Sequence, residues 1–283
     1  MTASFGALVD PTLTLFDAMV LGLVEGITEF LPISSTGHLI VAQRLLGLPG
    51  NTVDNVFAIG IQMGAITAIL VVYWVRLWNA VRTMLRVVPG RPNLLFQIAI
   101  AAFPAAFLGL LVDDWIDAHL FSVRTVALTT VVGGVLLLVV EHVLRSRTSP
   151  PSELDTMSYR TALWVGLFQC LALVPGTSRS GATIAGALLL GLSRPAAAEF
   201  SFLVGLPILY GASGWKLLKH RDLLAGDALL PFCTGTLVAF LSALVVVRPF
   251  VRFLRSHTFA PFAWYRIVVG VLLAILCAAG VLV

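Results

Sequence analysis

Residues 22–38 read GLVEGITEFLPISSTGH, and a second stretch, residues 166–181, reads GLFQCLALVPGTSRSG. Both stretches start as Gly-x-x-(Glu/Gln), pass through a proline and end in a cluster of hydroxyl side chains closed by glycine. The outer glycines match at one offset of 144 residues (Gly22 with Gly166, Gly37 with Gly181). Both stretches lie within strongly apolar sequence. Because charged side chains and hydroxyl clusters cost free energy inside a bilayer, their presence there predicts a functional site.

The composition indicates a membrane protein. Hydrophobic residues make up 59% of the 283 residues and charged residues only 11%, whereas soluble domains carry about 25% charged residues. The mean hydropathy is +0.99, and apolar stretches near the spanning length of about 20 residues recur along the chain. The net charge of +4 comes without a run of Lys or Arg, so we expect no nucleic-acid partner. The scattered cysteines predict neither a metal site nor a disulfide.

Six stretches are long and apolar enough to cross a membrane. We predict spans over residues 54–77, 94–113, 123–144, 196–217, 228–248 and 264–283. The segments around the two motifs are shorter, since 161–174 and 182–192 hold too few apolar residues to cross. We therefore predict an all-α polytopic fold of six transmembrane helices plus two re-entrant helix-loop-helix hairpins.

Arginines give the expected orientation. They concentrate in the connections near residues 76–91, 145–160 and 248–255, which the positive-inside rule places in the cytoplasm. The loop with Asp113, Asp114 and Asp117 then lies outside, whereas the basic loop from Lys216 to Arg221 fits this scheme poorly. Each half consists of a hairpin followed by three crossings, so the second half starts on the opposite face. We predict one membrane domain over residues 1–283, built as an inverted-topology repeat of about 11–145 and about 158–283.

The two motifs supply the groups needed for phosphoryl transfer. Glu25 and Glu29 share one helix face, as do Ser35 and His38. Arg179 can hold phosphate oxygens in two-point contact, and the half-helix N-termini favour anions. Candidate catalytic residues are thus Ser35, His38, Glu29, Glu25 and Arg179, and candidate phosphate-binding residues are Ser34, Thr36, Ser178, Arg179, Ser180 and Thr183.

Simpler interpretations stand beside this one. Hydroxyls at a helix break often only satisfy freed backbone groups. His38 could be a packed, hydrogen-bonded side chain, Arg179 could merely pair with a glutamate, and the two glutamates could form a proton or cation path. The Asp113–Asp117 segment matches a DDxxD pattern that binds magnesium and diphosphate in soluble prenyl-diphosphate synthases. It occurs once, in a short connection, so we interpret it as solvated.

Residues 25–38 and 175–183 resemble the bacterial undecaprenyl-diphosphate phosphatases of the bacitracin-resistance type, and the similarity extends over nearly the whole chain. The resemblance implies an integral hydrolase of the inner membrane that converts a C55 polyprenyl diphosphate to the monophosphate and inorganic phosphate. The carrier would return to cell-wall synthesis, and resistance to bacitracin would follow. It also implies a site open to the outer, periplasmic face, and roles for the positions of Glu25, Glu29, Ser35, His38, Ser178 and Arg179.

Several alternatives remain open at this point. Ser35 could attack the terminal phosphorus with His38 as its base, or His38 could be the nucleophile. Glu25 and Glu29 could orient the histidine or hold a divalent cation, magnesium or calcium, which the resemblance implies; no organic cofactor is expected. A transporter or flippase of the same lipid is the rival function, because inverted repeats with broken helices are typical of transporters. Homo-oligomer formation is compatible with the many small residues on the helix faces.

Overall fold

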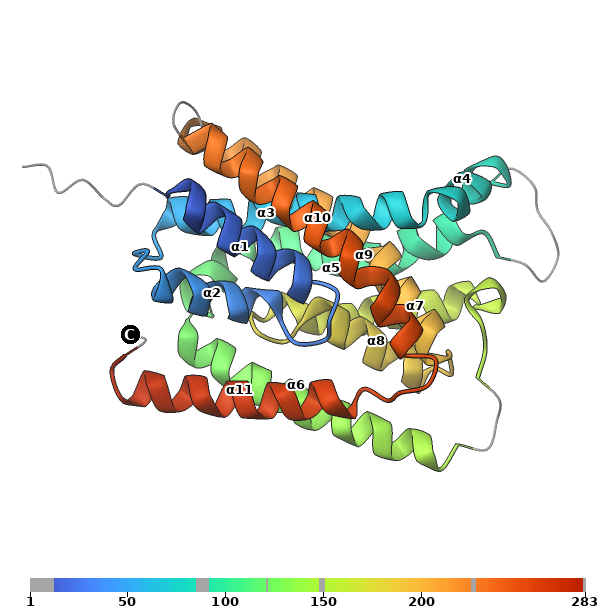
Figure 1. Cartoon of the computed structure of the whole chain (residues 1–283). Coiled ribbons are helices and arrows are strands. Elements are labelled where there is room, and N and C mark those ends of the chain that lie inside the picture. Colours follow the sequence, from blue (N-terminus) through green and yellow to red (C-terminus); the bar gives the residue numbers. More distant parts are fainter. Residues whose placement is uncertain (1–12, 85–91, 121, 148–150, 225–227, 282–283) are drawn as a thin grey trace, which may run out of the picture.

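The fold is all-helical over the residues that the computed structural model describes, 13–84, 92–120, 122–147, 151–224 and 228–281 (Figure 1). Six helices are long and apolar enough to cross a membrane: α3 (Thr52–Val72), α5 (Leu94–His119), α6 (Val123–Arg145), α9 (Arg194–Lys219), α10 (Leu229–Phe253) and α11 (Ala260–Ala278). Shorter elements complete the described chain: α1 (Leu15–Thr28), α2 (Ser35–Leu45), α4 (Trp74–Arg82), η1 (Leu154–Thr156), α7 (Tyr159–Gln169), η2 (Cys170–Leu173), α8 (Arg179–Leu189) and η3 (Arg221–Leu224). The chain is therefore a multi-pass membrane protein, as its composition predicts.

The first predicted span is wrong at its C-terminal end. We expected one helix over 54–77, but α3 ends at Val72, and Tyr73 leaves the helical conformation with φ −105° and ψ 15°. The chain then forms the separate helix α4, whose sequence WVRLWNAVR carries two arginines. The charged residues of α4 place it outside the hydrocarbon core, where water can satisfy backbone groups and the chain can leave the helix.

The DDxxD segment is also placed differently from our expectation. We assigned Asp113–Asp117 to a connection between spans, but α5 continues as a helix to His119. The apolar part of α5 ends at Val112, so the aspartates occupy helical turns beyond it. Asp114 is exposed and lies 3.2 Å from Lys219 Nζ on α9. A helix can extend past the apolar layer because its backbone hydrogen bonds are satisfied internally.

The helix α9 lies at the centre of the bundle. Of its most apolar 18-residue window, 67% is buried, against 28–50% for the other five spans. It packs against α3, α5 and α8. The other spans expose large apolar side chains such as Phe103, Leu128 and Val245. Exposed apolar surface of this extent is expected where lipid replaces water as the solvent.

Residues separated by 144 positions adopt the same local structures. Thr14 and Ser158 cap the N-termini of α1 and α7. Ser34 and Ser178 precede α2 and α8, each of 11 residues, and both have φ of 73°. The two short-helix pairs also pack alike, α1 and α2 on each other as α7 and α8 do. In Figure 1 the α1–α2 pair and the α7–α8 pair enter the bundle from opposite ends and meet inside it.

Glycines let α1 and α7 approach their neighbours closely. A Cβ at Gly22 would lie 3.1 Å from the carbonyl carbon of Gly235 on α10, and one at Gly166 would lie 2.9 Å from that of Ala101 on α5. Backbone atoms in packed helices cannot move aside cheaply. These contacts place both short helices firmly against a spanning helix.

Gly166→Ala should therefore destabilise the protein, by about 1–3 kcal/mol. Gly214→Ala is the matched control on α9, because a Cβ there meets no described atom within 4 Å and alanine favours helix by about 1 kcal/mol. Thermal unfolding of both variants in the same detergent measures the difference. Equal melting temperatures for the two variants would mean that the α7–α5 contact does not constrain the fold.

Candidate functional site

The site forms where two interruptions of helix meet. We call residues 29–34, between α1 and α2, the first break, and residues 174–178, between η2 and α8, the second break. Ser34 and Ser178 end the two breaks and are the non-glycine residues with positive φ in the described ranges. Their hydroxyls accept from Gly37 N at 3.4 Å and Gly181 N at 3.1 Å, capping α2 and α8. Strained conformations of this kind occur mainly where the surrounding structure enforces them for function.

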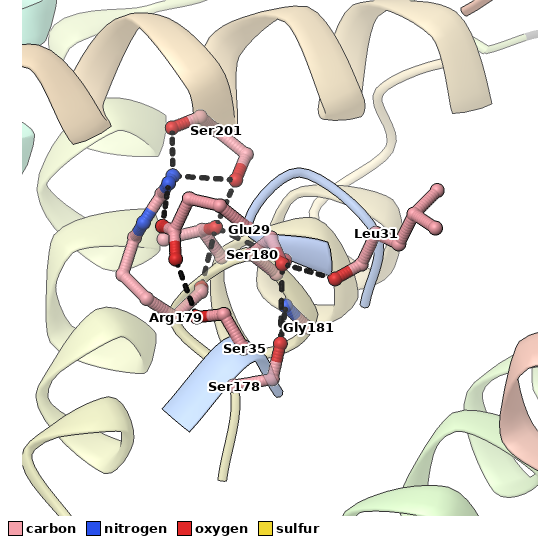
Figure 2. A network of polar contacts seen from close by, with 9 residues as sticks. Glu29, Leu31, Ser35, Ser178, Arg179, Ser180, Gly181 and Ser201 are labelled. Carbon is pink, nitrogen blue, oxygen red and sulfur yellow. Dashed lines mark hydrogen bonds and ion pairs between the residues drawn. The ribbon is translucent and has the colours of Figure 1, made fainter. Parts of the chain in front are cut away.

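Glu29 joins the two breaks. Its Oε1 accepts from Arg179 Nη2 at 2.8 Å, and its Oε2 accepts from Ser35 Oγ at 2.6 Å (Figure 2). Ser180 Oγ adds a bond to the carbonyl of Leu31 at 3.0 Å, and it lies 3.1 Å from Ser178 Oγ. A carboxylate that accepts a serine proton while it is held by a guanidinium can serve as a base for that serine.

Arg179 is held in place from its other side by α9. Its Nη1 donates to Ser201 O at 2.7 Å and lies 3.4 Å from Ser201 Oγ. The Ser201 hydroxyl is 2.5 Å from Thr183 Oγ1, so Thr183 supports the arginine through Ser201. Nε of Arg179 is buried and has no hydrogen-bond partner among the described residues. It is therefore a donor that an anion in the site could use.

Arg266 on α11 connects both breaks to α6 through hydrogen bonds. Its guanidinium is buried and donates to four carbonyls: Pro32 O at 3.2 Å, Gly176 O at 3.1 Å, Thr129 O at 3.2 Å and Thr130 O at 3.2 Å. Gly133 makes room for it, since a Cβ there would contact the guanidinium. Sequence reasoning missed Arg266, because it lies in an apolar span far from either motif.

Arg266→Lys should cost about 2–4 kcal/mol of stability, because one ammonium cannot reach four separate carbonyls and leaves some of them unsatisfied. Arg147→Lys is the control: that arginine also donates to carbonyls, of Leu188 and Leu189, but at an exposed helix end. We expect it to cost less than about 1 kcal/mol. The same loss in both variants, measured by thermal unfolding, would contradict a special role for the buried contacts.

A cavity of about 540 Å³ opens above the breaks. Its floor carries the polar groups of both breaks, and its walls come from the C-terminal halves of α5 and α9. The floor residues include Glu29, Ser34, Ser35, Thr36, Gln169, Ser178 and Arg179, and the walls include Ala105, Ala106, Leu110, Pro207, Ile208 and Ala212. A polar floor with apolar walls suits a ligand with an ionic head and a hydrocarbon part.

Basic side chains from α9 stand at the mouth of this cavity. Lys216 and Lys219 line it together with Asp114 and Trp215. In the sequence, the same lysines belong to the basic loop that fitted the positive-inside rule poorly. Cationic groups beside a narrow opening raise the local concentration of an anionic ligand. The misfit was the one sequence signal that could have revealed them.

Two matching polar side chains are buried beside the breaks without partners. Neither carboxylate oxygen of Glu25 and neither amide atom of Gln169 has a hydrogen-bond partner in the described part of the chain. The two residues occupy equivalent positions in the duplicated motif. Gln169 lines the cavity, whereas Glu25 does not. Unsatisfied buried polar groups are costly, so we expect bound water, an ion or substrate to reach them.

His38 lies apart from Ser35 in its hydrogen bonding. Nδ1 is 2.7 Å from Ser34 O, and Nε2 is 2.7 Å from Tyr265 Oη on α11. The imidazole and phenol rings are stacked with centroids 5.6 Å apart. Of the predicted site residues, the structure thus brings together at the cavity floor Glu29, Ser34, Ser35, Thr36, Ser178 and Arg179. Ser180 contacts Ser178 and the carbonyl of Leu31 but does not line the cavity. His38 faces α11 instead, and Thr183 faces Ser201.

Known proteins match this chain over nearly its full length. The model of the family described as bacitracin resistance protein BacA matches residues 18–272. This chain belongs to the BacA family. A relative from Chromobacterium violaceum named undecaprenyl-diphosphatase 1 is 48% identical over 91% of this chain and 94% of its own. A relative from Nitrosomonas europaea named undecaprenyl-diphosphatase is 46% identical over 95% of this chain and 96% of its own. Another of that name, from Enterococcus faecalis, is 42% identical over 91% of this chain and 95% of its own.

A divalent cation would have a limited set of protein ligands in this BacA-family chain. No group of three or more His, Cys, Asp or Glu residues within the described ranges could hold a metal ion by itself. Glu25 offers two buried oxygens without partners, and Glu29 lies one helical turn away. Magnesium commonly binds through one or two carboxylates plus substrate phosphates, and Glu29 is the carboxylate at the floor of the cavity.

Proposed function

We propose that this protein is an undecaprenyl-diphosphate phosphatase, which hydrolyses the lipid diphosphate to undecaprenyl phosphate and inorganic phosphate. The observation that carries the proposal is the Ser35–Glu29–Arg179 chain of contacts between two helix N-termini at the floor of the cavity. The relatives' names point to the same reaction. Hydrolysis returns the carrier lipid for cell-wall synthesis, and the reaction fits the bacitracin resistance in the family's name.

The membrane arrangement that we propose is an inverted-topology repeat with two re-entrant hairpins. The helices α1, α2, α7 and α8 have 14, 11, 11 and 11 residues, whereas a span needs about 20. The matching conformations at an offset of 144 residues and the opposite directions of entry support two equivalent halves. Irregular backbone at membrane depth is tolerated where it lines a cavity, which fits both breaks.

The cavity is proposed to open to the outer face of the bacterial inner membrane. Asp114 and Lys219 of the cavity lining belong to the C-terminal ends of α5 and α9, and these ends lie at the end of the bundle opposite α4 (Figure 1). The arginine-rich connections lie at the α4 end, which the positive-inside rule assigns to the cytoplasm. The substrate would enter with its diphosphate at the floor, while its long tail leaves between the apolar walls of α5 and α9.

The proposed chemistry is a two-step transfer through Ser35. Glu29 removes the hydroxyl proton as Ser35 Oγ attacks the terminal phosphorus, and the bridging P–O bond breaks to release undecaprenyl phosphate. Water then attacks the phosphoserine, which releases inorganic phosphate and regenerates the serine. Arg179 and the N-terminal amides of α2 and α8 stabilise the negative charge of each transition state. A divalent cation held by Glu25 and Glu29 would neutralise part of the diphosphate charge.

His38 has a positioning role in this scheme. The sequence suggested it as the base or the nucleophile, but Glu29 is the group within hydrogen-bonding distance of Ser35 Oγ. His38 connects Ser34 O, at the strained residue before α2, to Tyr265 on α11. It thereby holds the start of α2, and with it Ser35, against the bundle.

The decisive experiment follows phosphate release from polyprenyl diphosphate by detergent-purified protein, with magnesium, with calcium and with a chelator. Release by the wild type, together with trapped phosphate on Ser35 identified by mass spectrometry, is the expected result. Trapped phosphate on His38 would mean that the histidine is the nucleophile. Trapped phosphate on neither residue would favour direct attack by water. A folded protein that binds the lipid without releasing phosphate would instead favour a flippase, the function that the two opposed halves also suit.

A further inference from the structure

A second cavity, of about 350 Å³, lies at the end of the bundle that carries α4. It is lined by Val72 and Tyr73 at the end of α3, by Glu199 near the start of α9, and by Arg248, Val251, Arg252 and Arg255 at the end of α10. None of these residues belongs to the catalytic cavity. The catalytic function described above makes no use of this cavity.

The second cavity has an excess of positive charge. Arg248, Arg252 and Arg255 are exposed, and their side chains have no hydrogen-bond or ion-pair partner among the described residues. Its one acidic side chain, Glu199, already has a cationic partner, because Oε1 lies 2.8 Å from Arg76 Nη1. Arg76 also pairs with Asp155. Guanidinium groups without a carboxylate partner are the preferred protein ligands of phosphate oxygens.

Tyr73 adds a neutral donor to the lining of this cavity. Burial raises the pKa of the Tyr73 hydroxyl, and the nearby charge of Glu199 raises it further. The hydroxyl therefore remains protonated at physiological pH. It can donate to an anion that the arginines hold.

The surroundings of this cavity match an amphiphile at the membrane surface. On α10, the exposed side chains of Leu237, Leu241 and Val245 form a stripe with a four-residue spacing that leads to Arg248. Residues three and four apart share a helix face, so an apolar stripe runs directly into the arginine cluster.

The helix α4 marks the level of the lipid headgroups beside the cavity. It follows Tyr73 directly, and Trp74 and Trp78 are 54% and 44% exposed, with stacked rings 6.1 Å apart. Arg82 lies over the Trp78 ring at 5.4 Å. Exposed tryptophans next to arginines are typical of the headgroup layer of a bilayer.

We propose that the α4-end cavity is a binding site for the headgroup of an anionic glycerophospholipid. Arg248 and Arg252 hold its phosphate, Tyr73 donates to it, and the acyl chains lie along the α10 stripe. The site is separate from the catalytic cavity, so the proposal holds whether or not the chain hydrolyses a polyprenyl diphosphate.

Native mass spectrometry of the detergent-purified full chain tests the proposal. Titration with phosphatidylglycerol and with phosphatidylcholine should show at least about tenfold tighter binding of the anionic lipid, because each arginine near a headgroup adds to the attraction. Arg248→Gln/Arg252→Gln should remove that preference. Tyr73→Phe should weaken it by a few-fold, from the loss of one hydrogen bond. Melting temperatures without lipid should match the wild type, because both arginines are exposed.

The control is Arg145→Gln/Arg160→Gln, which removes the same charge from exposed arginines near that end that do not line the cavity. This control variant should keep at least half of the wild type's ratio of phosphatidylglycerol affinity to phosphatidylcholine affinity. An equal loss in both double variants would mean diffuse attraction to basic loops and would overturn the site. Equal binding of the two lipids by the wild type would overturn it as well. In a third titration, inorganic phosphate at millimolar concentration replaces the lipid. If phosphate raises the melting temperature of the wild type but not of Arg248→Gln/Arg252→Gln, and neither lipid does so, the site binds free phosphate instead.

Discussion

Ser35→Ala lowers kcat for phosphate release by about 1,000-fold or more, which is the largest effect that we expect from a single substitution. The reason is the position of the hydroxyl, which is buried at the cavity floor and donates to Glu29 at 2.6 Å. Glu29→Gln keeps the shape of the carboxylate but cannot accept the proton. It should lower kcat by about 100- to 1,000-fold.

A double variant decides whether the two groups act as a unit. If Glu29 serves only to activate Ser35, Ser35→Ala/Glu29→Gln loses no more activity than Ser35→Ala alone, because nothing remains to be activated. Losses that multiply would show that Glu29 has an independent task, such as holding a cation. Thr36→Ala gives the comparison, since its hydroxyl lines the same cavity without contacting Glu29, and a loss of about tenfold is expected for one phosphate donor. If Ser35→Ala loses no more than that, direct attack by water replaces the covalent mechanism.

Arg179→Ala and Arg179→Lys both lower kcat by about 100- to 1,000-fold, while the KM for polyprenyl diphosphate changes less. The guanidinium reaches Glu29 through Nη2 and Ser201 through Nη1 at the same time. A lysine has a single nitrogen and cannot hold both positions while it also faces a phosphate. The lysine variant therefore keeps the charge but loses the geometry. Steady-state kinetics of phosphate release measure both variants.

The matched control is Arg194→Lys. Arg194 also makes a two-point contact with a buried carboxylate, Glu141, through Nε at 3.1 Å and Nη2 at 2.5 Å, but it lies away from the cavity. Its substitution should lower stability more than activity, with kcat within about threefold of the wild type at a temperature where the variant is folded. If Arg179→Lys retains wild-type kcat, or if Arg194→Lys loses as much, the proposed role of Arg179 in charge stabilisation is wrong.

The spanning helices follow closely from the sequence. In a bilayer every backbone N–H and C=O group must form a hydrogen bond within the protein. A long apolar run therefore forms a helix. The helices α5, α6, α9 and α10 begin within two residues of their predicted starts. The end of α3 was missed because Tyr73 and the helix that follows it lie at the interface, where water can satisfy backbone groups and the constraint is relaxed.

The duplicated motif predicted which two segments meet, but it did not give the contacts between them. Spacing along a helix favoured a Ser35–His38 pair, since the two residues share a face. In the structure Ser35 instead turns to Glu29, which lies on the other side of the first break, and His38 turns to Tyr265. The conformation of a break, with Ser34 at φ 73°, sets these directions, and no helical periodicity extends across it.

The sequence by itself determined the helical class, the six spans, the duplication and the residue types gathered at the breaks. These follow from local constraints: the length of apolar runs, the cost of charge in lipid and the need for proline, glycine and hydroxyls at a helix end. Only the tertiary structure decided which groups meet. Arg266, Ser201 and the lysines at the cavity mouth reach the site from α9 and α11, distant in sequence from the breaks that they serve. Hydrogen bonds depend on distance and angle in space, and helix packing sets both.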